Sequence, residues 1–147
     1  MFGLSQRRLK SLVDGEEIKK AIQKAEMECS GEIRVSVSRF FWGSVEKAAR
    51  KAFVRLGMDR TELRNGILFF VVPSRKRFIV LGDEGIHREV GQEFWDKVAE
   101  AVSGYFRKGH FTEGLVHGIR EVGERLKKHF PHAVDDVNEL PDEVDYE

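Results

Sequence analysis

The chain has 147 residues, of which 41% are hydrophobic and 34% charged, with 25 basic and 25 acidic side chains. This length suits one compact domain, and the apolar fraction excludes a chain that is disordered throughout. No apolar run approaches the roughly 20 residues needed to cross a bilayer, and three basic residues interrupt any signal-peptide core at positions 7–10. The single cysteine, Cys29, cannot form an internal disulfide. A reducing compartment is thus favoured, and we expect a cytoplasmic protein without a membrane span.

The charges are distributed unevenly along the chain. Residues 134–147 hold seven acidic side chains and no basic ones, which leaves 18 acidic against 25 basic in residues 1–133, a net charge of +7. Three interpretations of the acidic tail stay open: a solvated segment, an extension docked on the basic body, and a mimic of nucleic acid. Leu140 and Val144 favour docking. The basic body alone does not predict nucleic-acid binding, because no recognisable nucleic-acid-binding module accompanies it.

The first half of the chain predicts a strand between two helices. Asp14 opens a capping box ahead of an apolar helical stripe, which predicts a helix over residues 15–29. Residues 32–38 alternate strictly and predict a strand with its apolar side chains facing a core and its polar side chains facing the other way. Ser44 is placed to cap a helix over residues 45–56.

The second half predicts a hairpin followed by two helices. The continuous apolar run at residues 67–72 is typical of a central strand covered on both faces, and a short turn joins it to a strand over residues 77–81. Apolar spacing predicts a helix over residues 92–107. Thr112 is placed to cap a last helix over residues 113–129.

This order of elements predicts an α/β fold. The helix between the first two strands makes them parallel neighbours, and the doubly buried strand requires helices on both faces. We therefore expect a small mixed β-sheet in a three-layer α/β/α sandwich. The chain divides into an N-terminal arm (residues 1–13), an α/β domain (residues 14–130) and an acidic C-terminal tail (residues 131–147).

The segment after the third strand carries the first candidate site. Asp83 and Glu84 offer oxygens that suit Ca²⁺ or Mg²⁺, and His87 could add a nitrogen ligand or carry a proton in catalysis. The same residues also suit a glycine-bracketed turn with solvated charges. Neither a dinucleotide-binding glycine pattern nor a phosphate-binding loop is present, so no nucleotide cofactor is expected.

Two further segments could contact a ligand. The aromatic run Phe40, Phe41 and Trp42 either covers the edge of the core or forms an exposed contact for a partner protein. Arg75, Lys76 and Arg77 form a basic hairpin tip, which is either a solvated turn or a contact for an anion.

Four motifs in this order resemble the TPM domain family. They are EIRV at 32–35, NGILFFV at 65–71, RKRFIVLG at 75–82 and FRKGHFTEGL at 106–115. The family comprises thylakoid-lumen proteins linked to photosystem II repair and many bacterial relatives, and the tail resembles that of a cytosolic bacterial branch. The resemblance spans residues 14–130 and implies an α/β/α sandwich.

The family resemblance also implies two activities. Acid phosphatase chemistry and divalent-cation binding at an acidic pocket are ascribed to plant members, and only Asp83 and Glu84 match that pocket here. We favour a non-enzymatic module that binds a divalent cation, a partner protein or both in protein maintenance or repair. The alternative is a metal-assisted phosphatase for phosphomonoesters, with Asp83 and Glu84 holding the metal, His87 protonating the leaving group, and Arg75 or Arg77 contacting the phosphate.

Overall fold

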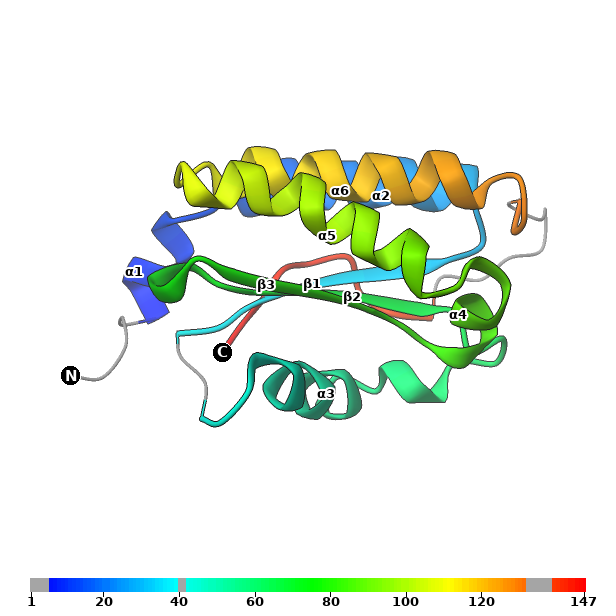
Figure 1. Cartoon of the computed structure of the whole chain (residues 1–147), viewed down its shortest axis with the longest axis horizontal. Helices are drawn as coiled ribbons and strands as arrows, with labels where there is room; N and C mark the ends of the chain where they lie inside the picture. Colours follow the sequence, from blue (N-terminus) through cyan, green and yellow to red (C-terminus); the bar gives the residue numbers. More distant parts are fainter. Residues whose placement is uncertain (1–5, 40–41, 132–138) are drawn as a thin grey trace.

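The computed structural model, which describes residues 6–39, 42–131 and 139–147, shows a four-stranded sheet between helices (Figure 1). The strands lie in the order β3-β2-β1-β4. β1 (Glu32–Val37) pairs in parallel with β2 (Gly66–Val72), and β2 pairs antiparallel with β3 (Arg77–Gly82). The predicted mixed sheet and its parallel first pair are confirmed.

The helices cover both faces of this sheet. Figure 1 shows three of them on one face, α2 (Gly15–Glu28), α5 (Gln92–Arg107) and α6 (Phe111–Leu126), and α3 (Val45–Arg55) on the other. β2 supplies side chains to two hydrophobic clusters, with Ile67, Phe69 and Val71 on the first face and Leu68, Phe70 and Val72 on the second. A strand buried on both faces has no polar side to present, which explains its unbroken apolar sequence.

Shorter elements connect this framework. α1 (Gln6–Ser11) precedes α2, α4 (Glu84–Val90) precedes α5, and 3₁₀ turns occur at Met58–Arg60 and Pro73–Arg75. Within the three described ranges, no helix combines the length and the apolar character needed to cross a membrane.

Local side-chain bonds start two of the helices as predicted. The Asp14 carboxylate accepts the Glu17 N–H at 3.1 Å, and the Ser44 hydroxyl accepts the Lys47 N–H at 3.1 Å. The last helix was predicted over residues 113–129 but lies two to three residues earlier at both ends, because α6 begins at Phe111 and ends at Leu126. The Thr112 hydroxyl accepts the Asp14 N–H at 2.9 Å, so it serves a partner distant in sequence rather than its own helix.

The polar face of β1, which alternation placed opposite the apolar one, is also buried. Glu32, Arg34 and Ser36 are exposed by only 4%, 9% and 0%. The C-terminal segment (residues 139–147) covers them, and its strand β4 (Asp145–Tyr146) pairs in parallel with β1. The Leu140 N–H donates to Glu32 Oε1 at 2.8 Å, and the Ser36 hydroxyl donates to Asp145 Oδ2 at 2.8 Å.

Charge also holds the C-terminal segment in place. Arg55 lies 2.8 Å from Asp145 Oδ2 and 3.3 Å from Glu147 Oε1, and Lys19 lies 2.9 Å from Glu143 Oε1.

The N-terminal arm also contacts the domain, because Leu9 of α1 is fully buried in the first hydrophobic cluster. The division of the chain at residues 13 and 131 into parts that fold separately stays a prediction.

Deletion of residues 134–147 is expected to leave a folded but weaker domain. The sheet keeps its three long strands, while the loss of buried Leu140 and of the ion pairs of Arg55 should lower the free energy of unfolding by about 2–4 kcal/mol. Urea denaturation followed by circular dichroism measures this change. A synthetic peptide of residues 139–147 added in excess should restore part of the lost stability. A truncated chain without helical signal would show that the segment belongs to the folding unit.

Candidate functional site

Asp83 lies between β3 and α4 and is the N-cap residue of the helix. Its N–H donates to the Gly66 carbonyl at 2.8 Å, continuing the β2–β3 ladder, and its Oδ1 accepts the Glu84 N–H at 2.8 Å. The segment expected to be a loop therefore forms the first turn of a seven-residue helix. This capped position fixes the Asp83 carboxylate, which is 8% exposed, at the edge of the sheet.

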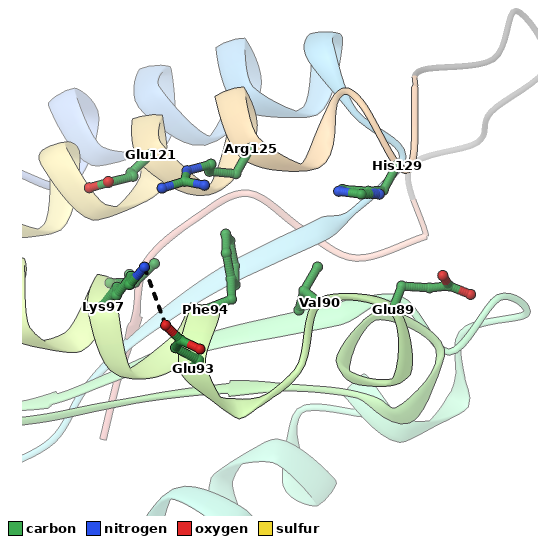
Figure 2. A pocket seen from close by; sticks show the side chains of 9 residues that line it. Glu89, Val90, Glu93, Phe94, Lys97, Glu121, Arg125 and His129 are labelled. Atoms are coloured by element: carbon green, nitrogen blue, oxygen red, sulfur yellow. Dashed lines mark ion pairs between the residues drawn. The ribbon is translucent and has the colours of Figure 1, made fainter.

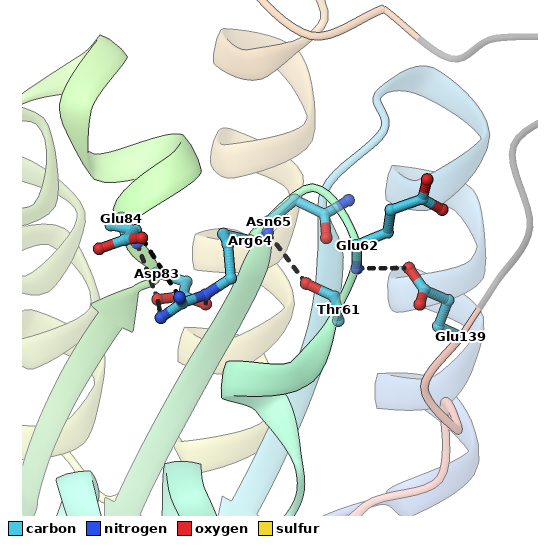
Figure 3. Close-up of polar contacts among 7 residues, drawn as sticks. All are labelled: Thr61, Glu62, Arg64, Asn65, Asp83, Glu84 and Glu139. Atoms are coloured by element: carbon cyan, nitrogen blue, oxygen red, sulfur yellow. Dashed lines mark hydrogen bonds and ion pairs between the residues drawn. The ribbon is translucent and has the colours of Figure 1, made fainter.

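Arg64 engages both predicted carboxylates (Figure 3). Its Nε lies 2.7 Å from Asp83 Oδ2, its second terminal nitrogen lies 3.0 Å from Asp83 Oδ1, and its other terminal nitrogen lies 3.2 Å from Glu84 Oε1. The hydrogen bonds to Asp83 raise the pKa of Arg64 above its usual range. Two parallel bonds from one guanidinium to one carboxylate are the strongest geometry for such a pair.

The loop that carries Arg64 is tied to α4 through the backbone. The Gly85 N–H donates to the Arg64 carbonyl at 2.9 Å. A methyl group added at Gly85 would lie 2.2 Å from the Leu63 carbonyl oxygen, so only glycine lets these two segments approach. The sequence analysis missed Arg64, yet the hairpin register could have found it. Pairing Ile67 with Gly82 places the residues before β2 beside those after β3.

Asp83 and Glu84 do not fit a divalent cation while Arg64 is in place. A cation would have to replace the guanidinium that occupies both Asp83 oxygens. In the part of the chain that the structure describes, no three histidine, cysteine or acidic side chains gather as a metal site. A cation at Asp83 and Glu84 therefore stays a prediction that requires rearrangement of Arg64.

His87 contacts a tryptophan rather than the carboxylates. The Trp95 indole N–H donates to His87 Nδ1 at 3.1 Å, which places the proton of the neutral imidazole on Nε2. Trp95 is 3% exposed and packs directly on Gly82, where an added methyl group would lie 2.2 Å from its ring. The His87 side chain thus holds the indole against the end of β3.

These residues lie at one end of a groove of about 880 Å³ that follows β3. One wall is α3, which contributes Glu46, Arg50, Phe53 and Val54. The other wall is α5, which contributes Gln92, Trp95, Asp96 and Ala99. Residues 78–83 line the floor, so the groove combines an apolar strand with walls that carry both apolar and charged side chains.

The basic hairpin tip lies at the opposite end of β3. Arg77 is the first residue of that six-residue strand and Gly82 the last, a span of about 16–17 Å. The structure therefore does not bring Arg75 or Arg77 together with Asp83, Glu84 and His87. Phosphate contact by the arginines and metal binding by the carboxylates cannot act on the same phosphoryl group in this arrangement.

Trp42, the described residue of the aromatic run, does not line the groove. Phe40 and Phe41 fall outside the described residues, and Trp42 is 83% exposed. Trp42 lines a smaller hollow of about 340 Å³ together with Lys47, Lys51 and Glu147. A contact between this run and a partner protein stays a prediction, and such a contact would be separate from the groove.

Another hollow of about 310 Å³ lies between α5 and α6 (Figure 2). Glu89, Glu93 and Glu121 line it together with Lys97, Arg125 and His129, and Lys97 lies 3.4 Å from Glu93. Its charges alternate in sign, and none of the sequence-predicted site residues lines it. This mixture is typical of a solvated surface between two helices.

Two glutamates beneath the C-terminal segment are strongly perturbed, and the sequence analysis did not single them out. Burial and a hydrogen bond to Asp142 raise the pKa of Glu26 to about 9, while Glu26 Oε2 accepts the Ile33 N–H at 3.0 Å. Burial raises the pKa of Glu32 to about 7. Perturbed carboxyls are common at functional sites, but here the docked segment accounts for both.

Comparison with known proteins places this arrangement in a family. The family model for the TPM domain matches residues 11–125. The NMR structure of the BA42 protein from the psychrophilic bacterium Bizionia argentinensis matches with a TM-score of 0.87 at 38% identity, covering 95% of this chain and 98% of that one.

Two more distant structures share the fold. The N-terminal domain of a protein from P. gingivalis matches at 17% identity with a TM-score of 0.70, covering 83% of this chain and 82% of that one. The N-terminal domain of the cg2496 protein from Corynebacterium glutamicum matches at 14% identity with a TM-score of 0.64, covering 80% and 76%. Comparison with curated proteins gave no match. The family model and the similarity to BA42 show that this chain belongs to the TPM domain family.

Proposed function

We propose that this TPM domain is a non-enzymatic binding module, which receives a partner protein in the groove along β3 and acts in protein maintenance or repair. The observation that supports this proposal is the groove itself. Its floor is a strand at the edge of the sheet, and its walls carry the apolar side chains of Phe53, Val54 and Trp95. Apolar clefts with a few polar groups are the usual form of a binding site.

The state of the carboxylates argues against the phosphatase alternative. Both Asp83 oxygens accept hydrogen bonds from Arg64, and the arginines of the hairpin tip lie at the far end of β3. Phosphoryl transfer needs a nucleophile or a metal-bound water together with positive charge on the phosphoryl oxygens. Asp83 and Glu84 could bind a divalent cation only after Arg64 has moved away from both carboxylates.

Hydrolysis of para-nitrophenyl phosphate tests the proposal. Turnover should stay at background from pH 4 to 9 with Ca²⁺, Mg²⁺, Mn²⁺ or a chelator, and Asp83→Asn/Glu84→Gln should not change it. The control, Glu121→Gln/Glu124→Gln, removes the same charge from α6. Metal-dependent turnover that disappears in the first variant and persists in the control would establish the phosphatase and contradict the binding module. Calorimetric titration of the same proteins with Ca²⁺ checks the cation separately.

A further inference from the structure

The free edge of β3 presents an unused set of backbone hydrogen-bonding groups. β3 is the last strand of the sheet and pairs only with β2. Because Asp83 donates its N–H to the Gly66 carbonyl, antiparallel alternation turns the backbone groups of every second residue away from β2. The outward residues are Phe78, Val80 and Gly82. No described residue hydrogen-bonds their N–H or C=O groups across the edge.

The opposite edge of the sheet is already covered by the chain itself. β4 adds to β1 in parallel, and the acidic residues Asp145 and Glu147 of this extended segment pair with Arg55. One edge thus carries an acidic extended segment, whereas the β3 edge borders the groove with no strand paired to it, with Val80 6% exposed between the half-buried Phe78 and Gly82. An open edge is a template for another strand unless something covers it.

Charge along the groove distinguishes its two ends. Arg77 begins the strand, next to the basic turn of Arg75 and Lys76, and no described carboxylate lies within ion-pair distance of Arg77. Asp83 and Glu84 end the strand with only Arg64 to balance them, and Asp96 lines the wall beside them. The start of β3 is therefore positive and its end negative.

We propose that the β3 edge binds an extended peptide segment of a partner protein by strand addition. This inference rests on the proposed function and specifies how the groove binds. The added strand runs antiparallel to β3, so that its acidic C-terminal end lies beside Arg77 and its basic N-terminal end beside Asp83 and Glu84. Apolar side chains on its two faces contact Phe53 and Val54 on α3 and Trp95 on α5.

A second copy of this chain fits the edge less well than a peptide does. The groove is walled by α3 on one side and α5 on the other. A second copy would have to bring its own α3 and α5 up to these walls for the two β3 strands to reach the 4.7–4.9 Å spacing of a ladder. A single extended segment has no flanking helices and reaches the floor.

A designed peptide tests this mode of binding. The probe is acetyl-Lys-Thr-Val-Val-Val-Thr-Asp-Glu, which places valine on both faces of an extended strand, and two further versions carry backbone N-methyl groups at either the odd or the even internal positions. One methylated version loses the N–H groups that face β3 and should bind about tenfold or more weakly, while the other should bind within about twofold of the parent. NMR hydrogen exchange should show new protection at the amides of Phe78, Val80 and Gly82.

Variants of the protein test the orientation. Arg77→Glu should weaken binding of the parent peptide several-fold and reduce its dependence on salt, whereas Arg120→Glu, the same change on α6, should leave binding unaltered. Absence of peptide binding, or equal binding of the two methylated peptides, overturns strand addition. A concentration-dependent dimer in light scattering that Arg77→Glu abolishes also overturns it, because the edge would then bind a second copy of the chain. None of these results contradicts the proposed function as a binding module. Only metal-dependent hydrolysis of the phosphate ester would contradict that.

Discussion

Replacement of Gly82 by alanine is expected to lower the free energy of unfolding by about 2–3 kcal/mol, because the new methyl group would overlap the Trp95 ring. The added carbon would lie 2.2 Å from Trp95 Cζ2 and 2.9 Å from Cε2. Trp95 cannot easily withdraw, since it is 3% exposed and its indole N–H is bonded to His87. Either the indole leaves its position or β3 moves away from α5.

The chain offers a control with the same chemical change and the opposite expected sign. Gly104 lies within α5, and a methyl group added there meets only an Arg107 terminal nitrogen at 4.0 Å. Gly104→Ala should therefore raise stability by about 0.5–1 kcal/mol, through reduced backbone entropy of the unfolded chain. Denaturant unfolding measures both variants, and the fluorescence of buried Trp95 should shift to longer wavelength only in Gly82→Ala.

A compensating substitution separates the ring overlap from other causes. Trp95→Leu removes the ring, so Gly82→Ala should cost much less in that background than in the wild type. If Gly82→Ala is as stable as the wild type, the close packing of Trp95 on β3 is incorrect. The groove wall described above would then need a different position for the indole.

The framework of this fold follows from local sequence patterns. The helix predicted over residues 92–107 matches α5 residue for residue, because its apolar stripe and the glycines at both ends are all local signals. The β2–β3 hairpin was equally predictable from two apolar runs and a short turn. Such elements depend on residues that are close in the chain.

The features that were not predicted depend on distant residues. α4 has only seven residues, too few for a periodic pattern to distinguish from a turn. Alternation identified β1 but could not show that residues 139–147 cover its polar face. Arg64 and Asp83 are 19 residues apart, so their pairing follows only once the hairpin register is known. The candidate residues were therefore found from the sequence, but their partners were not.

The partly buried carboxyl of Glu26 should make the stability of the protein depend on pH. Its pKa is about 9 in the folded chain, against an ordinary value of 4.5 that applies when the chain is unfolded. Between these values the folded chain keeps a proton that the unfolded chain has released, so the free energy of unfolding falls as pH rises. The contribution is complete below pH 4.5 and is lost by about pH 9. Glu32, with a pKa of about 7, adds to the fall in the lower part of this range.

Glu26→Gln should remove most of this dependence while keeping both contacts of the side chain. The amide oxygen can accept the Ile33 N–H, and the amide nitrogen can donate to Asp142 as the protonated carboxyl does. Near pH 5 the variant should match the wild type to within about 1 kcal/mol, and at pH 8 it should be more stable by several kcal/mol, about 4–5 for this pKa difference. Glu100→Gln, exposed on α5, is the control and should follow the wild type at every pH. Urea denaturation at intervals from pH 5 to 9 measures all three proteins.

Parallel curves of unfolding free energy against pH for the wild type and Glu26→Gln would contradict this prediction. They would show that Glu26 is ionised beneath the docked segment. In that case the ion pairs of Lys19 and Arg55 with the segment offset a negative charge at Glu26.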